Sequence, residues 1–177
     1  MASPTPFEIL QEIDQRCRVN AKGLPSGSQE EEDWIGIGFS LAGQRLIAKM
    51  ADVTEILPPP STIRLPGVKS WVKGLANIRG NLMPILDMNG FLQGANSQSS
   101  KDNRILVINK DGVVAGLLVD EVFGLRRFKP EMIEQQNYAG SNALSPFLDG
   151  AFSDNQSQWD IFNVKKLVNH EQFLKVV

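Results

Sequence analysis

From Trp34 onward the chain alternates short apolar segments with turn-forming residues, and this spacing limits the folds open to it more than any other feature. The clearest apolar segments, each of strand length, are residues 34–41, 44–50, 104–109, 113–119 and 158–162. Turn signals such as Ala42-Gly43 and Lys110-Asp111-Gly112 separate them. About nine or ten short strands in about 130 residues indicate a mainly β protein of small barrels or a sandwich.

Shorter segments complete the predicted order. We expect a strand or one helical turn over residues 51–57, a brief helix over 88–92, a strand over 120–125, a short helix over 130–136 and a strand over 147–153. Asp87 ends a strand and can cap the element that follows it. Asn163 is expected to cap one final helix that runs through Leu167, Val168 and Phe173.

A separate amphipathic helix is predicted at the N-terminus. Thr5-Pro6-Phe7-Glu8 has the form of a capping box, and Gly23 suits the end of the helix. Apolar side chains recur at helical spacing at Phe7, Leu10, Ile13 and Cys17. An acidic linker follows, so we expect two parts, residues 1–33 and residues 34–177. The apolar stripe either packs on its own domain or docks on a partner.

Composition narrows the function. The net charge of −2 argues against a nucleic-acid-binding protein, which usually carries a basic excess. Apolar segments are too short to span a bilayer, so no membrane insertion is expected. The single cysteine rules out an internal disulfide and favours a cytoplasmic location. One cysteine and one histidine cannot build a metal cluster, and we expect neither a metal nor another cofactor.

Catalytic groups are also scarce. His170 lies in the predicted last helix, where a surface position or a helix-end charge contact is expected, and Cys17 lies at the other end of the chain. Asp120 and Glu121 are adjacent, so on a strand they face opposite sides and cannot act as a pair. The sequence therefore favours a non-catalytic binding module over an enzyme, with no catalytic site.

Residues 74–87, Gly-Leu-Ala-Asn-Ile-Arg-Gly-Asn-Leu-Met-Pro-Ile-Leu-Asp, are the best candidate for a binding element. Gly74 and Gly80 predict a bend and a tight turn around one strand, and Pro84 predicts an edge or a bulge in the next. Arg79 is then held at a strand end, which suits a recognition residue; the alternative is an ordinary surface arginine.

This stretch resembles the motif of the CheW-like adaptors of bacterial chemosensory arrays: Gly-hydrophobe-x-Asn-hydrophobe-Arg-Gly, then Pro-hydrophobe-hydrophobe-Asp. Supporting similarities, in the same order and spacing, are Phe39-Ser40-Leu41, Val53-Thr54-Glu55-Ile56, Leu65-Pro66 and residues 116–122. The similarity covers about residue 34 to the C-terminus. Cys17-Arg18, Leu24-Pro25 and residues 71–77 resemble the branch that controls type IV pilus twitching motility.

The resemblance implies a fold of two five-stranded, SH3-like barrels around a shared core, with short helices and no catalysis. It implies two partners, the cytoplasmic tip of a methyl-accepting chemoreceptor and the regulatory domain of a CheA-type histidine kinase. By position in the motif, the receptor groove would contain Val53, Glu55, Ile56, Gly74, Asn77, Arg79, Gly80, Val122 and Leu125. Ile105 matches a strand nearer the kinase contact. For Val53, Val122 and Leu125, plain core packing is the alternative.

Two rival functions stay open. The chain could be the adaptor of a flagellar or another chemosensory array, and the identity of the kinase that it binds would distinguish these arrays. A small β-barrel nucleic-acid module would need a basic, aromatic face, yet the chain has one tyrosine and a negative net charge.

Overall fold

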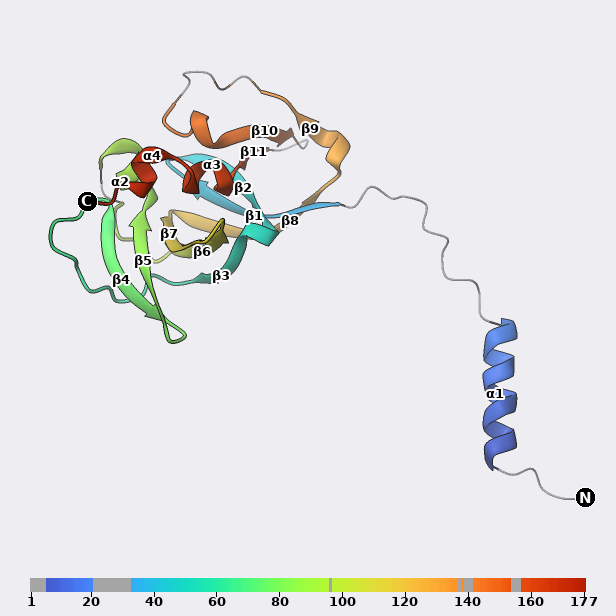
Figure 1. Ribbon diagram of the computed structural model, residues 1–177. Helices are drawn as coiled ribbons and strands as arrows, with labels where there is room; N and C mark the ends of the chain where they lie inside the picture. The colour runs from blue at the N-terminus through green and yellow to red at the C-terminus, as the bar shows by residue number, and fades with distance from the viewer. Residues whose placement is uncertain (1–5, 21–32, 96, 137, 139–141, 154–156) are drawn as a thin grey trace, which may run out of the picture. The chain divides into compact units, whose positions relative to one another are not determined.

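The computed structural model describes residues 6–20, 33–95, 97–136, 138, 142–153 and 157–177 (Figure 1). The chain divides into two compact units, Met1–Glu31 and Glu32–Val177. In the first unit, helix α1 spans Pro6–Asn20, and the side chains of Phe7, Leu10 and Ile13 on it are exposed. The predicted stop at Gly23, residues 25–32 of the predicted linker and the side chain of Cys17 lie outside the described residues.

The second unit contains two β-sheets. The six-stranded sheet has the order β8-β1-β2-β11-β10-β9, with β1 (Trp34–Leu41), β2 (Gln44–Lys49), β8 (Glu121–Phe128), β9 (Ile133–Glu134), β10 (Leu148–Ser153) and β11 (Gln158–Phe162). The five-stranded sheet has the order β3-β6-β7-β5-β4, with β3 (Val53–Leu57), β4 (Val72–Ile78), β5 (Asn81–Asp87), β6 (Arg104–Lys110) and β7 (Val113–Val119). The predicted mainly β class is confirmed.

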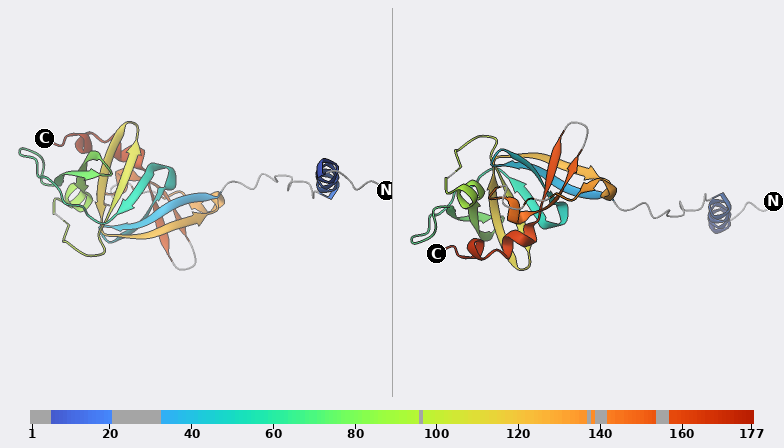
Figure 2. Two further views of the ribbon diagram at one scale, coloured as in Figure 1. Left: turned by 90° about the horizontal axis from the view of Figure 1, so that it is seen from below. Right: turned by 90° about the horizontal axis from the view of Figure 1, so that it is seen from above.

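Neighbouring strands are antiparallel except in two places. β2 pairs in parallel with β11, and β5 pairs in parallel with β7. Both parallel pairs join strands that are far apart in the sequence. Figure 2 shows the long antiparallel pair of β1 and β8 from two sides. None of the described helices combines the length and the hydrophobicity of a transmembrane span.

Each sheet contributes to a shared core and also has a core of its own. Alternate residues of β6 divide between them: Leu106 and Ile108 face the shared core, whereas Ile105 and Val107 face the core of the five-stranded sheet. This division explains the unbroken buried run over residues 105–108, because both faces of the strand are covered. The core of the six-stranded sheet contains the stacked rings of Phe128 and Phe152.

One short element departs from the sequence prediction. Residues 130–136 do not form a helix: a 3₁₀ turn, η2 (Pro130–Met132), leads into the two-residue strand β9, where Ile133 pairs with Phe152 of β10. Residues 51–57, in contrast, contain both predicted alternatives in succession, the end of the 3₁₀ turn η1 (Met50–Asp52) and then strand β3. η3 (Ser145–Phe147) precedes β10.

The C-terminal segment forms two helices instead of the one predicted. Asn163 caps α3 (Val164–Val168) by accepting a hydrogen bond from Lys166 N, as expected, but the chain then turns extended at His170 before α4 (Glu171–Leu174). His170 is not a fully solvent-exposed side chain: its ring packs against the rings of Phe91 and Phe147, and its Nδ1 atom is buried.

A buried polar network joins the two sheets. Asp87, at 0% exposure, caps α2 (Met88–Gln93) by accepting from Gly90 N, and it also accepts from the backbone and hydroxyl of Ser97 at 2.8 and 2.5 Å. Asn89 on α2 donates to Asp120 at 2.6 Å, and the same carboxylate accepts from Ala42 N in the β1–β2 turn. These bonds satisfy both carboxylates and connect the end of β5 to the six-stranded sheet.

Candidate functional site

The hairpin between β4 and β5 fixes the position of Arg79. Ile78 pairs with Asn81, so Arg79 and Gly80 form a two-residue turn, with φ of +49° and +85°. Two positive φ values are the mark of a type I′ turn, in which an arginine is strained by about 1–2 kcal/mol. The Asn77 side chain accepts a hydrogen bond from Gly80 N at 2.8 Å and holds the turn.

Strand β3 presents Glu55 toward this hairpin. The pairing of β3 with β6 shifts register between Val53 and Glu55, and the hydroxyl of Thr54 donates to the carbonyl of Val107 at 3.1 Å within this irregularity. Val53, Glu55 and Leu57 are half-buried, whereas Thr54 and Ile56 are exposed. Beyond the register shift, Glu55 pairs with Val107 and so lies on the face of the five-stranded sheet's own core, whereas Ile56 pairs with Leu106 and lies on the opposite face.

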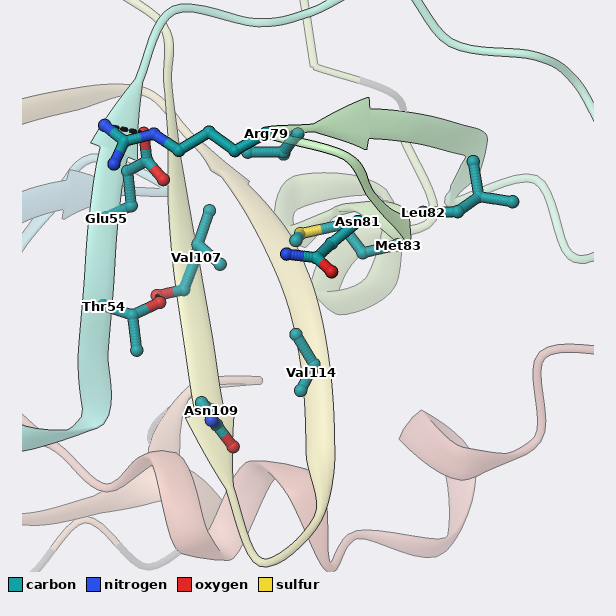
Figure 3. A pocket seen from close by; sticks show the side chains of 10 residues that line it. Thr54, Glu55, Arg79, Asn81, Leu82, Met83, Val107, Asn109 and Val114 are labelled. Carbon is teal, nitrogen blue, oxygen red and sulfur yellow. Dashed lines mark hydrogen bonds and ion pairs between the residues drawn. The ribbon is translucent and has the colours of Figure 1, made fainter.

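Arg79 and Glu55 form an ion pair of 2.9 Å between Nη2 and Oε1. Because β4 and β3 are the two outer strands of the five-stranded sheet, this pair connects its opposite edges. Figure 3 shows the Arg79 side chain reaching from the hairpin to Glu55. The Arg79 side chain stays 80% exposed, so the ion pair leaves most of the guanidinium open to a partner.

A pocket of about 480 Å³ lies beside this ion pair. Its walls combine apolar and polar side chains from β3, β5, β6, β7 and the hairpin: Thr54, Glu55, Ile78, Arg79, Asn81, Leu82, Met83, Val107, Asn109 and Val114. Leu82 and Val114 are 64% and 43% exposed, so both offer apolar surface at the pocket. An apolar hollow beside a charged pair suits a protein segment with apolar anchors and a charged or polar neighbour.

Gly74 has a structural reason to be glycine. Its φ is +132°, and a Cβ atom there would lie 2.2 Å from the carbonyl oxygen of Ile63. Ile63 and Leu75 exchange two backbone hydrogen bonds at this point, of 2.8 and 2.9 Å. The residue is buried, so it shapes the support of the hairpin and offers no side chain to a partner.

The other predicted groove residues divide between the two sheets. Val53, on β3, packs partly against the shared core, and so does Val122, on β8. Leu125, also on β8, is 48% exposed and pairs with Ile37 of β1. The structure thus brings Glu55, Asn77, Arg79 and Gly80 together at one hairpin, whereas Val122 and Leu125 belong to the edge strand of the other sheet.

Ile105 is fully buried in the core of the five-stranded sheet. A buried side chain can influence binding only through the shape of its strand. The kinase contact expected near Ile105 stays a prediction, in which Ile105 would act by shaping β6 and not by touching the kinase.

Several lining residues were not among the predicted site residues. Leu82, Met83 and Asn81 follow the hairpin turn directly, and Val114 and Asn109 flank the next hairpin, between β6 and β7. The exposure of Leu82 has no signal in the sequence: strand alternation after the exposed Asn81 would predict a buried Leu82, yet both residues are exposed. Val114 reaches the pocket because of long-range strand pairing, which local sequence patterns do not predict.

Within the described residues, no group of three or more histidine, cysteine, aspartate or glutamate side chains is placed to hold a metal ion. Asp120 is engaged by Asn89 and Ala42 N, as described above, and Asp87 is a helix cap.

Comparison with known proteins agrees with the fold. The model of the CheW-like domain matches residues 36–172, and the chain belongs to this family. It is 45% identical over 172 residues to Protein PilI of Pseudomonas aeruginosa, covering 97% of this chain and 96% of that one. Protein FrzA of Myxococcus xanthus is 29% identical, covering 83% and 91% of the two chains.

More distant relatives include the chemotaxis protein CheW of Helicobacter pylori, 26% identical over 71% of this chain and 75% of the relative. The crystal structure of the scaffolding protein TtCheW from Thermoanaerobacter tengcongensis superposes with a TM-score of 0.69, at 24% identity, covering 79% of this chain and 95% of that chain. This likeness confirms the predicted CheW-like fold. The sheet of β1 and β2 has six strands in this chain, because the short β9 adds to the five expected.

Proposed function

We propose that this protein is a non-catalytic adaptor that couples methyl-accepting chemoreceptors to a CheA-type histidine kinase in the system that controls type IV pilus twitching motility. The observation that carries the proposal is the 45% identity to Protein PilI over 97% of the chain. The family and the fold support the adaptor class, and the near full-length similarity supports the pilus-linked branch.

The hairpin site supports a binding role in physical terms. Arg79 stands 80% exposed on a strained turn, beside a pocket with the exposed apolar side chains of Leu82 and Val114. We assign the receptor-tip contact to a groove centred on this hairpin, which Glu55, Asn77, Arg79 and Gly80 form. Val53, Ile56 and Gly74 would shape it from the same sheet, and Val122 and Leu125, on β8 of the six-stranded sheet, would complete it from the facing side. Burial of Leu82 and Val114 by a partner would remove apolar area from water, which favours association.

Biolayer interferometry with two immobilised ligands tests the proposal: the regulatory domain of a pilus-type chemosensory kinase and a receptor cytoplasmic tip. We expect the protein to bind both. Arg79→Glu places a carboxylate opposite Glu55 and is expected to weaken one of the two complexes by more than about 1 kcal/mol, or about fivefold in Kd. Because Arg79 is mostly exposed, the circular dichroism spectrum should not change.

A matched control is Lys165→Glu, the same charge change at an exposed position on α3. It should leave both complexes unchanged. Failure of the folded protein to bind either ligand would contradict the adaptor role, and binding to a flagellar-type kinase alone would move the protein to a flagellar array. Clear binding of generic DNA or RNA at moderate salt would favour the nucleic-acid alternative.

We further propose that the part before the domain, residues 1–33, adds a contact specific to the pilus system. Support comes from α1, whose Phe7, Leu10 and Ile13 side chains are exposed. If a chain lacking residues 1–33 binds receptor and kinase and restores twitching as well as the full chain, this part of the proposal is wrong.

A further inference from the structure

A second pocket, of about 350 Å³, lies outside the hairpin site on the connection between β3 and β4. This connection runs along the outer side of β4 (Figures 1 and 2). Three cations line the pocket together with two hydroxyl groups and three apolar side chains: Arg64, Lys69, Lys73, Thr62, Ser70, Leu65, Val68 and Val72. No aspartate or glutamate is among these lining residues, in a chain whose net charge is −2.

The backbone around the pocket is held in place by hydrogen bonds. Ile63 and Leu75 bond to each other twice, at 2.8 and 2.9 Å, and a Cβ on Gly74 would lie only 3.2 Å from the Cα of Arg64. The backbone of Arg64 is therefore held beside the segment that carries Lys73. The backbone of Lys69 is held as well, because Lys69 N donates to the carbonyl of Val176 and Lys69 O accepts from Val72 N. The Arg64 and Lys69 side chains themselves are exposed and reach the pocket from this support.

The positive charge of the pocket is only weakly compensated. Lys73 Nζ lies 3.9 Å from the buried carboxylate of Asp87, beyond hydrogen-bond distance, and that carboxylate already accepts bonds from Gly90 and Ser97. Among the described residues, neither Arg64 nor Lys69 takes part in an ion pair. Three like charges around one hollow repel one another, and a bound anion would relieve this repulsion.

We propose that this pocket binds a ligand through a phosphoryl group. Arg64 offers a planar fork of donors, Lys69 and Lys73 add point charges, and the hydroxyls of Thr62 and Ser70 can complete the donor set. A phosphate monoester carries about two negative charges and three terminal oxygens, which matches this set better than a single carboxylate does. The apolar side chains of Leu65, Val68 and Val72 would contact the non-phosphate part of the ligand. This proposal is independent of the adaptor function.

Nuclear magnetic resonance titration of the ¹⁵N-labelled full chain tests it at low, constant ionic strength. The probes are inorganic phosphate, adenosine monophosphate, vesicles containing phosphatidylglycerol, sodium chloride as a screening control, and a glutamate-rich peptide. We expect saturable shifts of the amides of residues 62–73 with phosphate and adenosine monophosphate. The double variant Arg64→Gln/Lys69→Gln should raise the Kd at least tenfold.

The matched control is Lys101→Gln/Lys129→Gln, which removes two exposed cations elsewhere and should leave the Kd unchanged. Binding of the vesicles together with free phosphate would extend the source to lipid headgroups. The proposal is overturned if phosphate shifts these amides no more than chloride does. It is also overturned if both double variants weaken binding equally, or if only the peptide or only the vesicles bind. Since the hairpin residues are intact in these variants, a negative result leaves receptor and kinase binding to be judged separately.

Discussion

Gly74→Ala tests how the hairpin that carries Arg79 is supported. The substituted side chain would meet two obstacles at once. Its Cβ would lie 2.2 Å from the carbonyl oxygen of Ile63, a backbone atom that cannot rotate away, and its φ of +132° lies where side chains are strained. Relief of the contact requires separation of Ile63 from Leu75, which would break their two backbone hydrogen bonds.

The size of the effect follows from these terms. The backbone strain costs about 1–2 kcal/mol, and each lost hydrogen bond costs about 1 kcal/mol. We therefore expect Gly74→Ala to lower the free energy of unfolding by about 3–4 kcal/mol. For a protein of this size, each 1 kcal/mol shifts Tm by about 2–4 °C, so the total shift is about 6–16 °C downward.

Gly80→Ala is the matched control in the same hairpin. Its φ is +85°, but a Cβ there would have no atom within 4 Å, so only the backbone strain of about 1–2 kcal/mol remains. Urea unfolding followed by circular dichroism measures both variants. If Gly74→Ala proves no more destabilising than Gly80→Ala, the close contact with Ile63 does not support the hairpin and the reasoning fails.

Three further changes give distinct outcomes. Arg79→Gly should leave the free energy of unfolding equal or higher by urea titration, since it relieves turn strain of about 1–2 kcal/mol, yet it should weaken partner binding in interferometry. Ser97→Ala should lower the free energy of unfolding by about 1–3 kcal/mol, because the buried Asp87 carboxylate loses a 2.5 Å hydrogen bond. Burial, and secondarily the hydrogen bond to Asp160, raise the pKa of the Tyr138 hydroxyl above its usual 10.0. The stability that the neutral hydroxyl adds is therefore complete below about pH 10 and is lost as the pH rises. Tyr138→Phe should therefore flatten the alkaline decline of the unfolding free energy, measured in urea from about pH 8 to pH 11.

Local signals in the sequence predicted the strands and hairpins well. Lys110-Asp111-Gly112 predicted the β6–β7 hairpin, and Asp111 and Gly112 indeed adopt the positive φ values of a tight turn. Asp87 and Asn163 predicted helix caps, since a short polar side chain can accept a bond from the first turn. Each of these features depends on a few adjacent residues, which is why the sequence alone could indicate them.

Long-range pairing decided the features that the sequence missed. Pro130 favours a helix start, but Ile133 gains a strand partner in Phe152, and the segment becomes β9. Nothing local distinguishes these two outcomes. The prediction of an edge or a bulge at Pro84, in contrast, agrees with the structure: the β4–β5 pairing shifts register beside it, between Val72 and Gly74. β5 lies inside its sheet, but its parallel pairing with β7 begins only at Ile85, so the missing N–H of Pro84 interrupts no bond in that pair.

The break between α3 and α4 at His170 has a geometric cause, which becomes clear only once the buried positions of Leu167 and Phe173 are known. In one continuous helix, Phe173 would be rotated by about 600° from Leu167, which places the two side chains about 120° apart. Both are buried in the shared core, and Phe173 packs against Trp71 and Phe91. The extended backbone at His170 turns α4 so that Phe173 reaches this core.

Stability does not explain why an arginine occupies position 79. Its ion pair with Glu55 is at the surface, where such pairs contribute about 0–1 kcal/mol, whereas the left-handed backbone costs an arginine about 1–2 kcal/mol relative to an unstrained conformation. The balance is neutral or unfavourable, and Leu82, at 64% exposure three residues further on, adds an apolar surface that folding does not bury. Strain and exposed apolar area at one hairpin therefore support our proposal that a partner covers Leu82 and contacts the open side of Arg79.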